Sequence, residues 1–227
     1  MIVKIDILTL FPEMFDGFLN TSIIKRAREL GKVDIKVHNF RDYSTDKHGR
    51  VDDYPYGGGA GMVLMCEPIF NAIEDIRNDN SLVIMLSPSG NVFKQCIAVD
   101  LSKKKHIILL CGHYEGFDER IKTIVDMELS IGDYVLTGGE VPSMVITDAV
   151  TRLIPGVISE ASLDSESFND GLLDYPNYTR PEVFRGMRVP EVLLSGHHKN
   201  IEKYRQEEKV RLTNENRKDL TGGDNNG

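Results

Sequence analysis

The sequence has few cysteines and no long apolar run. Cys66, Cys96 and Cys111 are the three cysteines among the 227 residues, and no two of them form a CxxC pair. This number and spacing argue against a disulfide framework or a zinc site and favour buried thiols in a reducing compartment. No stretch approaches the ~18 apolar residues of a membrane-spanning helix, and the N-terminus lacks a signal-peptide pattern. We therefore expect a globular protein of the cytoplasm that makes no membrane contact.

The sequence also lacks an excess of positive charge. Its net charge of −8 at pH 7 does not suggest a nucleic-acid-binding protein. Local charge differs from this average, because residues 22–50 carry eight Lys or Arg against four acidic residues. Residues 157–176 carry five acidic residues and no Lys or Arg. The basic residues of 22–50 can therefore still form a surface that binds a polyanion. Solvated charge on helix surfaces is, however, the more common explanation of such a cluster.

Short apolar runs rich in β-branched residues alternate with segments of helical spacing. The runs predict strands at Ile2–Leu8, Val33–Val37, Leu82–Leu86, Ile107–Leu110 and Asp126–Ser130. Helical spacing occurs at Ile69–Ile76, Phe93–Leu101 and Val141–Leu153, with Pro142 near the start of the third segment, where proline is tolerated. This alternation predicts an α/β fold built on a mostly parallel sheet.

The composition changes after Pro155-Gly156. Ser, Asp, Glu and Asn then dominate, which predicts a flexible acidic linker over 158–176, following a first domain over 1–157. The segments Val183–Leu194 and Lys199–Leu212 are expected to be helical. We therefore predict a small helical C-terminal domain over 177–220 and a disordered tail over 221–227.

Glycine-bearing loops follow several of the expected strands. Two of them, 87–90 and 111–116, come directly after a strand, and a third spans 129–147 with Gly132 and the pair Gly138-Gly139. Because the carboxyl ends of parallel strands meet at one edge of the sheet, we expect a single ligand site there. The loops contain few Lys or Arg, which argues against a phosphate-rich cofactor and favours an adenosine-type ligand recognised by backbone groups. The glycine-rich segment 54–62 matches neither a P-loop nor G-x-G-x-x-G, and is interpreted as a platform that another group approaches closely.

Seven motifs occur together in a fixed order. They are LTLFPEMF (8–15), DDYPYGGGAGM (52–62), SPSG (87–90), CGHYEG (111–116), SIGDYVLTGGE (130–140), RLIPGV (152–157) and YTRP (178–181). With these motifs the chain resembles the bacterial tRNA (guanine-N1)-methyltransferases, the TrmD family, over nearly its whole length. The resemblance implies a SPOUT-class α/β domain with a C-terminal trefoil knot, and a homodimer with the active site at the subunit interface. It further implies methylation of N1 of the guanosine immediately 3′ of the anticodon in tRNA, with S-adenosylmethionine as methyl donor.

The resemblance places the methyl donor on the three glycine-bearing loops. The implied donor-binding residues are Leu86, Pro88, Gly90, Gly112, Tyr114, Glu115, Ser130, Ile131, Gly132, Asp133, Tyr134, Val135, Leu136, Gly138, Gly139 and Pro142. A divalent cation such as Mg²⁺ is also implied, with Glu115 as its contributor, although no ligand spacing in the sequence supports a metal site.

The resemblance also implies a carboxylate that removes the N1 proton. The family's base is the aspartate of an Asp-Ser-Phe motif, and Glu166 stands at that place here, with Asp164 and Asp170 as the other candidates. Arg152 matches an arginine that can stabilise charge on guanine O6. His113 departs from the pattern, because the family commonly has arginine there. The implied tRNA contacts are Asp170, Arg180, Arg185, Arg188 and Lys199, together with the cations of 25–50.

Two other functions stay open. One is a related knotted methyltransferase that acts on another RNA, against which the acidic linker and the YTRP motif argue. The other is a catalytically weak RNA-binding dimer that keeps the donor site but has lost its chemistry at the position of Glu166. Methylation of tRNA with guanosine or adenosine after the anticodon distinguishes all three.

Overall fold

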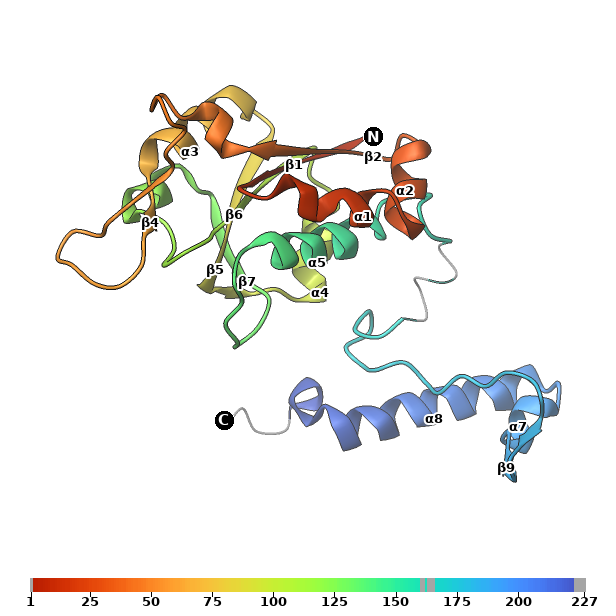
Figure 1. The fold of residues 1–227 in the computed structure, drawn as a ribbon. Helices are drawn as coiled ribbons and strands as arrows, with labels where there is room; N and C mark the ends of the chain where they lie inside the picture. Colours follow the sequence, from red (N-terminus) through yellow and green to blue (C-terminus); the bar gives the residue numbers. More distant parts are fainter. Residues whose placement is uncertain (1, 160–161, 163–165, 223–227) are drawn as a thin grey trace. The chain divides into compact units, whose positions relative to one another are not determined.

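A computed structural model describes residues 2–159, 162 and 166–222 of the protein. The chain forms two compact units, Met1–Ile158 and Ser159–Gly227 (Figure 1). Each unit has its own secondary structure, and each is described by itself below.

A five-stranded parallel sheet forms the centre of the first unit. Its strands are β1 (Val3–Thr9), β2 (Val33–Asn39), β5 (Ser81–Val92), β6 (His106–Cys111) and β7 (Met127–Ser130). Their order is β2-β1-β6-β5-β7, and every neighbouring pair is parallel. The predicted α/β class, the parallel sheet and the five predicted strands are confirmed. A short antiparallel pair, β3 (Asp52–Asp53) and β4 (Val63–Leu64), lies apart from this sheet.

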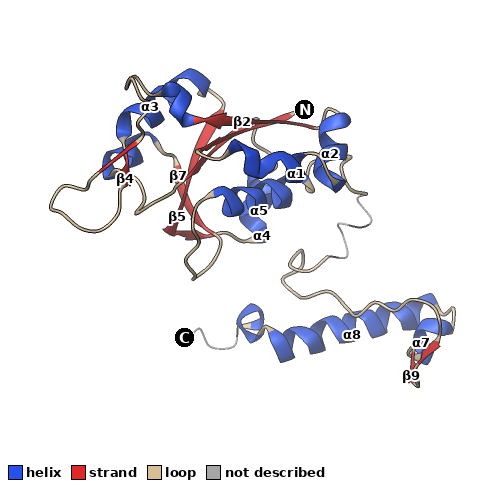
Figure 2. Ribbon diagram, viewed as in Figure 1, coloured by secondary structure: helices blue, strands red, loops and turns tan. Residues whose placement is uncertain are grey.

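Helices cover both faces of the sheet, so its central strands are apolar on both sides (Figure 2). The first face packs against α1 (Asp16–Leu19), α2 (Ser22–Glu29), α4 (Gln95–Leu101) and α5 (Glu140–Thr151). The second face packs against α3 (Cys66–Ile76) and the 3-10 helix η3 (Glu119–Ile124). Two further 3-10 turns are η1 (Pro12–Phe15) and η2 (Phe40–Tyr43). The helices α3, α4 and α5 lie where helical spacing predicted them, whereas the short amphipathic α2 was not predicted.

The second unit is built around one long helix, α8 (His198–Asn216), where the sequence predicted a helix. The segment 183–194 was also expected to be helical, and that prediction is wrong for most of it. It forms an antiparallel hairpin, β8 (Val183–Phe184) and β9 (Met187–Arg188), before the short helix α7 (Glu191–Leu194). The reason is local, because Arg185 and Gly186 both have positive φ and form a two-residue hairpin turn. A last 3-10 turn, η4, covers Lys218–Thr221, while 223–227 lie outside the described residues.

The expected linker over 158–176 falls partly outside the described residues. Its longest described stretch, 166–176, forms neither helix nor strand, but hydrogen bonds tether it to α8. The backbone N–H of Leu173 donates to Thr213 Oγ1 at 2.9 Å, and Lys209 Nζ donates to Asp170. This part of the acidic segment is therefore held against its own unit.

A buried carboxylate in β1 connects the central strands. The side chain of Asp6 is fully buried, and its oxygens lie 2.6 Å from His106 Nε2, 2.7 Å from His38 Nε2 and 2.8 Å from Lys4 Nζ. Burial alone would raise the pKa of Asp6, but the hydrogen bonds from His38, Lys4 and His106 outweigh it and lower the pKa to about 2. Asp6 therefore stays ionised inside the fold.

We expect Asp6→Asn to lower the free energy of unfolding by about 3 kcal/mol at pH 7, because a buried cluster loses its only anion. The folded-state pKa of about 2 lies below the ordinary value of 3.8, so the carboxylate stabilises the fold fully above about pH 5. That contribution is lost as the pH falls through 2. Urea melts of the wild type and of Asp6→Asn between pH 7 and pH 2 should show that the difference in their free energies of unfolding becomes smaller below pH 5. Asp34→Asn, on the exposed side of β2, is the control. A difference in unfolding free energy between the wild type and Asp6→Asn that does not change with pH would contradict this account.

Candidate donor-binding site

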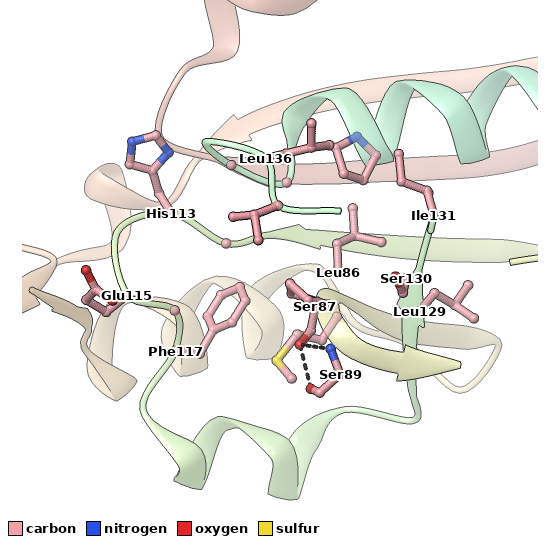
Figure 3. Close-up of a pocket in the computed structure, with 18 of the residues that line it drawn as sticks. Leu86, Ser87, Ser89, His113, Glu115, Phe117, Leu129, Ser130, Ile131 and Leu136 are labelled. Atoms are coloured by element: carbon pink, nitrogen blue, oxygen red, sulfur yellow. Dashed lines mark hydrogen bonds between the residues drawn. The ribbon is translucent and has the colours of Figure 1, made fainter. Parts of the chain in front are cut away.

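A pocket of about 420 Å³ lies at the edge of the sheet where β6 and β7 end, beside a bulge within β5 (Figure 3). Three chain segments line it, namely 85–89, 112–119 and 129–139, and Pro142 from the first turn of α5 completes the wall. The structure thus brings the three glycine-bearing loops of the sequence together around one cavity, as expected for the carboxyl ends of parallel strands.

The first loop exists because β5 bulges out of its ladder. Leu129 of β7 pairs with Leu86 and again with Asn91, so residues 87–90 of β5 have no partner in β7, and residues 87–89 line the pocket. Gly90 closes this bulge against β7, where a Cβ atom would lie 2.5 Å from the backbone nitrogen of Leu129. Gly90 therefore permits two backbones to pass closely and does not itself line the pocket.

The third loop lies directly on the second. The N–H of Gly139 donates to the carbonyl of Gly112 at 2.7 Å. A Cβ atom at Gly139 would lie 2.6 Å from the Cα of Cys111, and one at Gly138 would collide with the side chain of Glu140. The glycine pair thus allows close passage of one backbone over another at the wall of the pocket.

A buried carboxylate stands behind this wall. Glu140 is the first residue of α5, is almost fully buried, and accepts a hydrogen bond of 2.7 Å from Thr9 Oγ1. The start of a helix favours a negative charge. Near it, the ring of His113 packs on Phe11 with a centroid distance of 4.9 Å. Within the described part of the chain, His113 Nδ1 is buried and has no hydrogen-bond partner.

Most of the donor-binding residues implied by the resemblance line the pocket. They are Leu86, Pro88, Gly112, Tyr114, Glu115, Ser130, Ile131, Gly132, Tyr134, Val135, Leu136, Gly138, Gly139 and Pro142. Gly90 and the exposed Asp133 do not line it. Sequence reasoning did not name Met85, Ser87, Ser89, His113, Gly116, Phe117, Asp118, Glu119, Lys122, Leu129 and Thr137 for this site, although they line it too. Those outside η3 lie within or next to the quoted motifs, and that position was the signal by which they could have been predicted.

The charged side chains of the pocket are mainly acidic. Three carboxylates, Glu115, Asp118 and Glu119, face one lysine, Lys122. Lys122 Nζ already pairs with Glu119 at 3.0 Å, and a hydrogen bond from the Arg120 side chain holds the pKa of Asp118 well below its usual range. Asp118 and Glu119 are thus each paired with a cation, which leaves Glu115 as the main negative charge of the lining. A negative charge at this place favours a cationic ligand over a phosphate.

The glycine-rich segment 54–62 contacts Glu115, which lines the pocket. The N–H of Glu115 donates to the carbonyl of Met62 at 3.0 Å. A Cβ atom at Gly61 would lie 2.5 Å from Glu115 Cγ, so the glycine provides the space that the glutamate side chain fills. The segment is therefore a platform for a side chain of the second loop.

The residues implied in catalysis and tRNA contact lie outside the pocket lining. Arg152 is the C-cap of α5 in the first unit, and its N–H donates to the carbonyls of Asp148 and Val150. Glu166 is half-buried in the second unit. The second unit also contains Asp170, Arg180, Arg185, Arg188 and Lys199.

Asp170 is held in an ion pair, and Asp164 lies outside the described residues. Burial tends to raise the pKa of Asp170, but hydrogen bonds from Lys209 Nζ and from the N–H of Leu172 lower it below its ordinary value. A paired carboxylate with a lowered pKa is a weak proton acceptor, so Asp170 suits the role of base less well.

Across the described ranges no group of three or more His, Cys, Asp or Glu side chains is arranged to hold a metal ion. In the same ranges no helix has the length and apolarity to cross a membrane.

Comparison with known proteins gives one consistent result. The family model described as "tRNA (Guanine-1)-methyltransferase TrmD" matches residues 3–223. A Ureaplasma urealyticum protein named "tRNA (guanine-N(1)-)-methyltransferase" is 60% identical over 219 residues, which cover 96% of each chain. Proteins of the same name from Dictyoglomus turgidum and Staphylococcus epidermidis are 57% and 58% identical, over 96% of this chain and 89% and 90% of theirs. A match of this length and identity leaves one assignment: the chain belongs to the TrmD family of tRNA (guanine-1)-methyltransferases.

Proposed function

We propose that the protein transfers a methyl group from S-adenosylmethionine to N1 of the guanosine immediately 3′ of the anticodon in tRNA, in the cytoplasm. Membership of the TrmD family supports the reaction and the tRNA substrate. The observation that carries the donor assignment is the pocket at the ends of β6 and β7 and the bulge of β5, because the three glycine-bearing loops form it and its charged lining contains three carboxylates and one lysine.

The pocket suits the chemistry of this donor. S-adenosylmethionine supplies a methyl group on a positively charged sulfonium, which the carboxylate of Glu115 attracts, since Asp118 and Glu119 are paired with Arg120 and Lys122. The loop 129–139 offers backbone N–H and carbonyl groups to the edge of an adenine ring, while Leu86 and Leu136 supply apolar contacts (Figure 3). Donor recognition through backbone explains why the sequence places glycines rather than Lys or Arg here.

The protein must also remove a proton from the guanine. N1 carries a hydrogen, so its lone pair attacks the methyl carbon only as that proton leaves. We assign Glu166 as the acceptor. As the N1–C bond forms, the C–S bond breaks with its electron pair left on sulfur, and the proton passes to the carboxylate. Arg152 is assigned to stabilise the negative charge that builds on guanine O6.

A divalent cation does not fit the residues described. Glu115 is the carboxylate that the resemblance implies for it, and the side chain of Glu115 packs onto Gly61. No cluster of metal-ligating side chains surrounds it in the described ranges. We therefore assign no step to a metal ion.

The same proposal includes a trefoil knot and a homodimer with the active site at the subunit interface. The close passage of Gly139 over Cys111 supports the knot. Exposed apolar side chains at the pocket and on α5 support the dimer, because Val135 is 88% exposed and Tyr134, Val141 and Val145 are also exposed. An apolar surface of this kind fits a second copy of the chain.

The proposed reaction is tested with radiolabelled S-adenosylmethionine and two tRNA transcripts that differ only in the residue after the anticodon. We expect label in the guanosine transcript and none in the adenosine transcript. Label in both indicates a methyltransferase with another target, and label in neither, with tRNA still bound, indicates a catalytically weak RNA-binding dimer. Either of these results overturns the proposal.

A further inference from the structure

The tip of the β8–β9 hairpin exposes large apolar side chains. Phe184 is 54% exposed and Met187 is 64% exposed. These two residues pair across the hairpin, so they lie on the same face, next to the turn. A hydrogen bond of 3.0 Å from the N–H of Val189 to the carbonyl of Glu182 closes the base of the hairpin. The hairpin lies beside α7, at the N-terminal end of α8 (Figure 1).

The residue at the first position of the turn is unexpected. Arg185 has φ +48° and Gly186 has φ +81°, which together make the tight turn that asparagine and glycine favour. A residue with a long side chain adopts this left-handed conformation only at a steric cost. Turn geometry therefore does not explain an arginine at this position, whereas a role for its guanidinium does.

The guanidinium lies beside an aromatic ring. The Cζ of Arg185 is 5.3 Å from the centroid of the Phe184 ring, which is a cation–π contact. Arg188 follows in β9 and pairs with Val183, on the opposite face from Phe184. The tip therefore carries cations beside an exposed aromatic face, and residues 183–188 contain no acidic side chain.

The positive charge of the tip is not neutralised within its unit. In α8, Lys203 pairs with Glu207, Lys209 with Asp170, and Arg211 with Glu208 and Glu215. Among the residues that the structure describes, Arg180, Arg185 and Arg188 have no acidic partner within ion-pair distance. The unpaired cations of this unit thus include those beside its exposed aromatic ring.

We propose that this hairpin tip binds RNA by stacking an unpaired base on Phe184, with Arg185 and Arg188 contacting the adjacent phosphates. Aromatic rings and guanidinium planes are the groups on which unstacked RNA bases stack, and arginines neutralise the backbone. The inference rests on the proposed function in one respect, because it takes tRNA as the RNA. The alternative occupant of the exposed tip is a second copy of the chain. That alternative would explain the apolar side chains but not the unpaired arginines beside them.

The test compares binding of a fluorescently labelled tRNA transcript to the full chain and to four variants. Phe184→Leu keeps the apolar bulk but removes the aromatic face, and we expect a 5- to 30-fold rise in Kd and in KM for tRNA. Arg185→Asn suits the turn better, so it should keep the fold while weakening binding. Arg185→Asn and Arg188→Gln should each reduce the slope of log K against log salt by about 1. Lys203→Gln, which removes an ion-paired cation of α8, is the matched control and should bind as the wild type.

Each result decides the proposal. Wild-type tRNA binding by Phe184→Leu or by Arg185→Asn overturns it, and so does a loss of dimer in sedimentation, which would assign the tip to a second copy. Urea melts show whether Arg185→Asn keeps its fold, and Phe184→Leu tests the proposal independently of the turn. Binding is scored without methyl transfer, so a wild-type protein that binds tRNA but does not methylate it contradicts the proposed function alone.

Discussion

Glu166→Gln is expected to lower kcat by about 10²- to 10⁴-fold while leaving the affinity for tRNA near that of the wild type. Glutamine keeps the shape of the side chain and one of its two acceptor oxygens, but its amide cannot accept the N1 proton. The loss should therefore appear in kcat and not in KM. Single-turnover methylation with saturating S-adenosylmethionine and tRNA measures the chemical step directly.

Two further variants isolate this role of Glu166. Glu166→Asp restores the residue that the resemblance implies and keeps a carboxylate, so it should retain turnover far above that of Glu166→Gln. Asp170→Asn breaks the ion pair with Lys209 and should lower the stability of the second unit, with a smaller effect on kcat than Glu166→Gln. Wild-type turnover in Glu166→Gln would move the role of base to Asp164 or Asp170.

The parallel sheet could be predicted from the sequence because its strands are buried on both faces. In β6 all six residues are buried, so the strand reads as a continuous apolar run. The hairpin β8–β9 could not be predicted in this way, because its two-residue strands are exposed and carry no alternating pattern. The helix α2 could not be predicted either, because it has only eight residues and three of them are Lys or Arg, a pattern that also fits an exposed charged segment.

The position of the candidate site could be predicted better than its lining. Predicted strands followed by glycines indicated the edge of the sheet at which the pocket lies, because parallel strands end at a common edge. Which loop residues face the cavity depends on bulges that sequence spacing does not reveal. The bulge after Leu86 turns Gly90 toward β7 and away from the pocket. Lys122 lines the pocket because η3 places it there, and no pattern in the sequence indicates that short helix.

Gly139→Ala is expected to lower the free energy of unfolding by about 3 kcal/mol and to abolish binding of S-adenosylmethionine. The added Cβ would lie 2.6 Å from the Cα of Cys111 and 2.8 Å from the nitrogen of Gly112. Both are backbone atoms in or next to β6, which cannot rotate away as a side chain can. Relieving the collision moves the third loop off the second and breaks the hydrogen bond from Gly139 to Gly112.

The effect of this substitution should be steric alone, which makes it a sharp test. Gly139 has φ −84°, a conformation that alanine adopts without strain. Gly17→Ala in α1 is the matched control, because nothing lies within 4 Å of its added Cβ, and it should be neutral or slightly stabilising. Calorimetric titration with S-adenosylmethionine and urea melts measure the two effects. If Gly139→Ala binds the donor with wild-type affinity, the third loop does not form a wall of the donor site, and the assignment of this pocket fails.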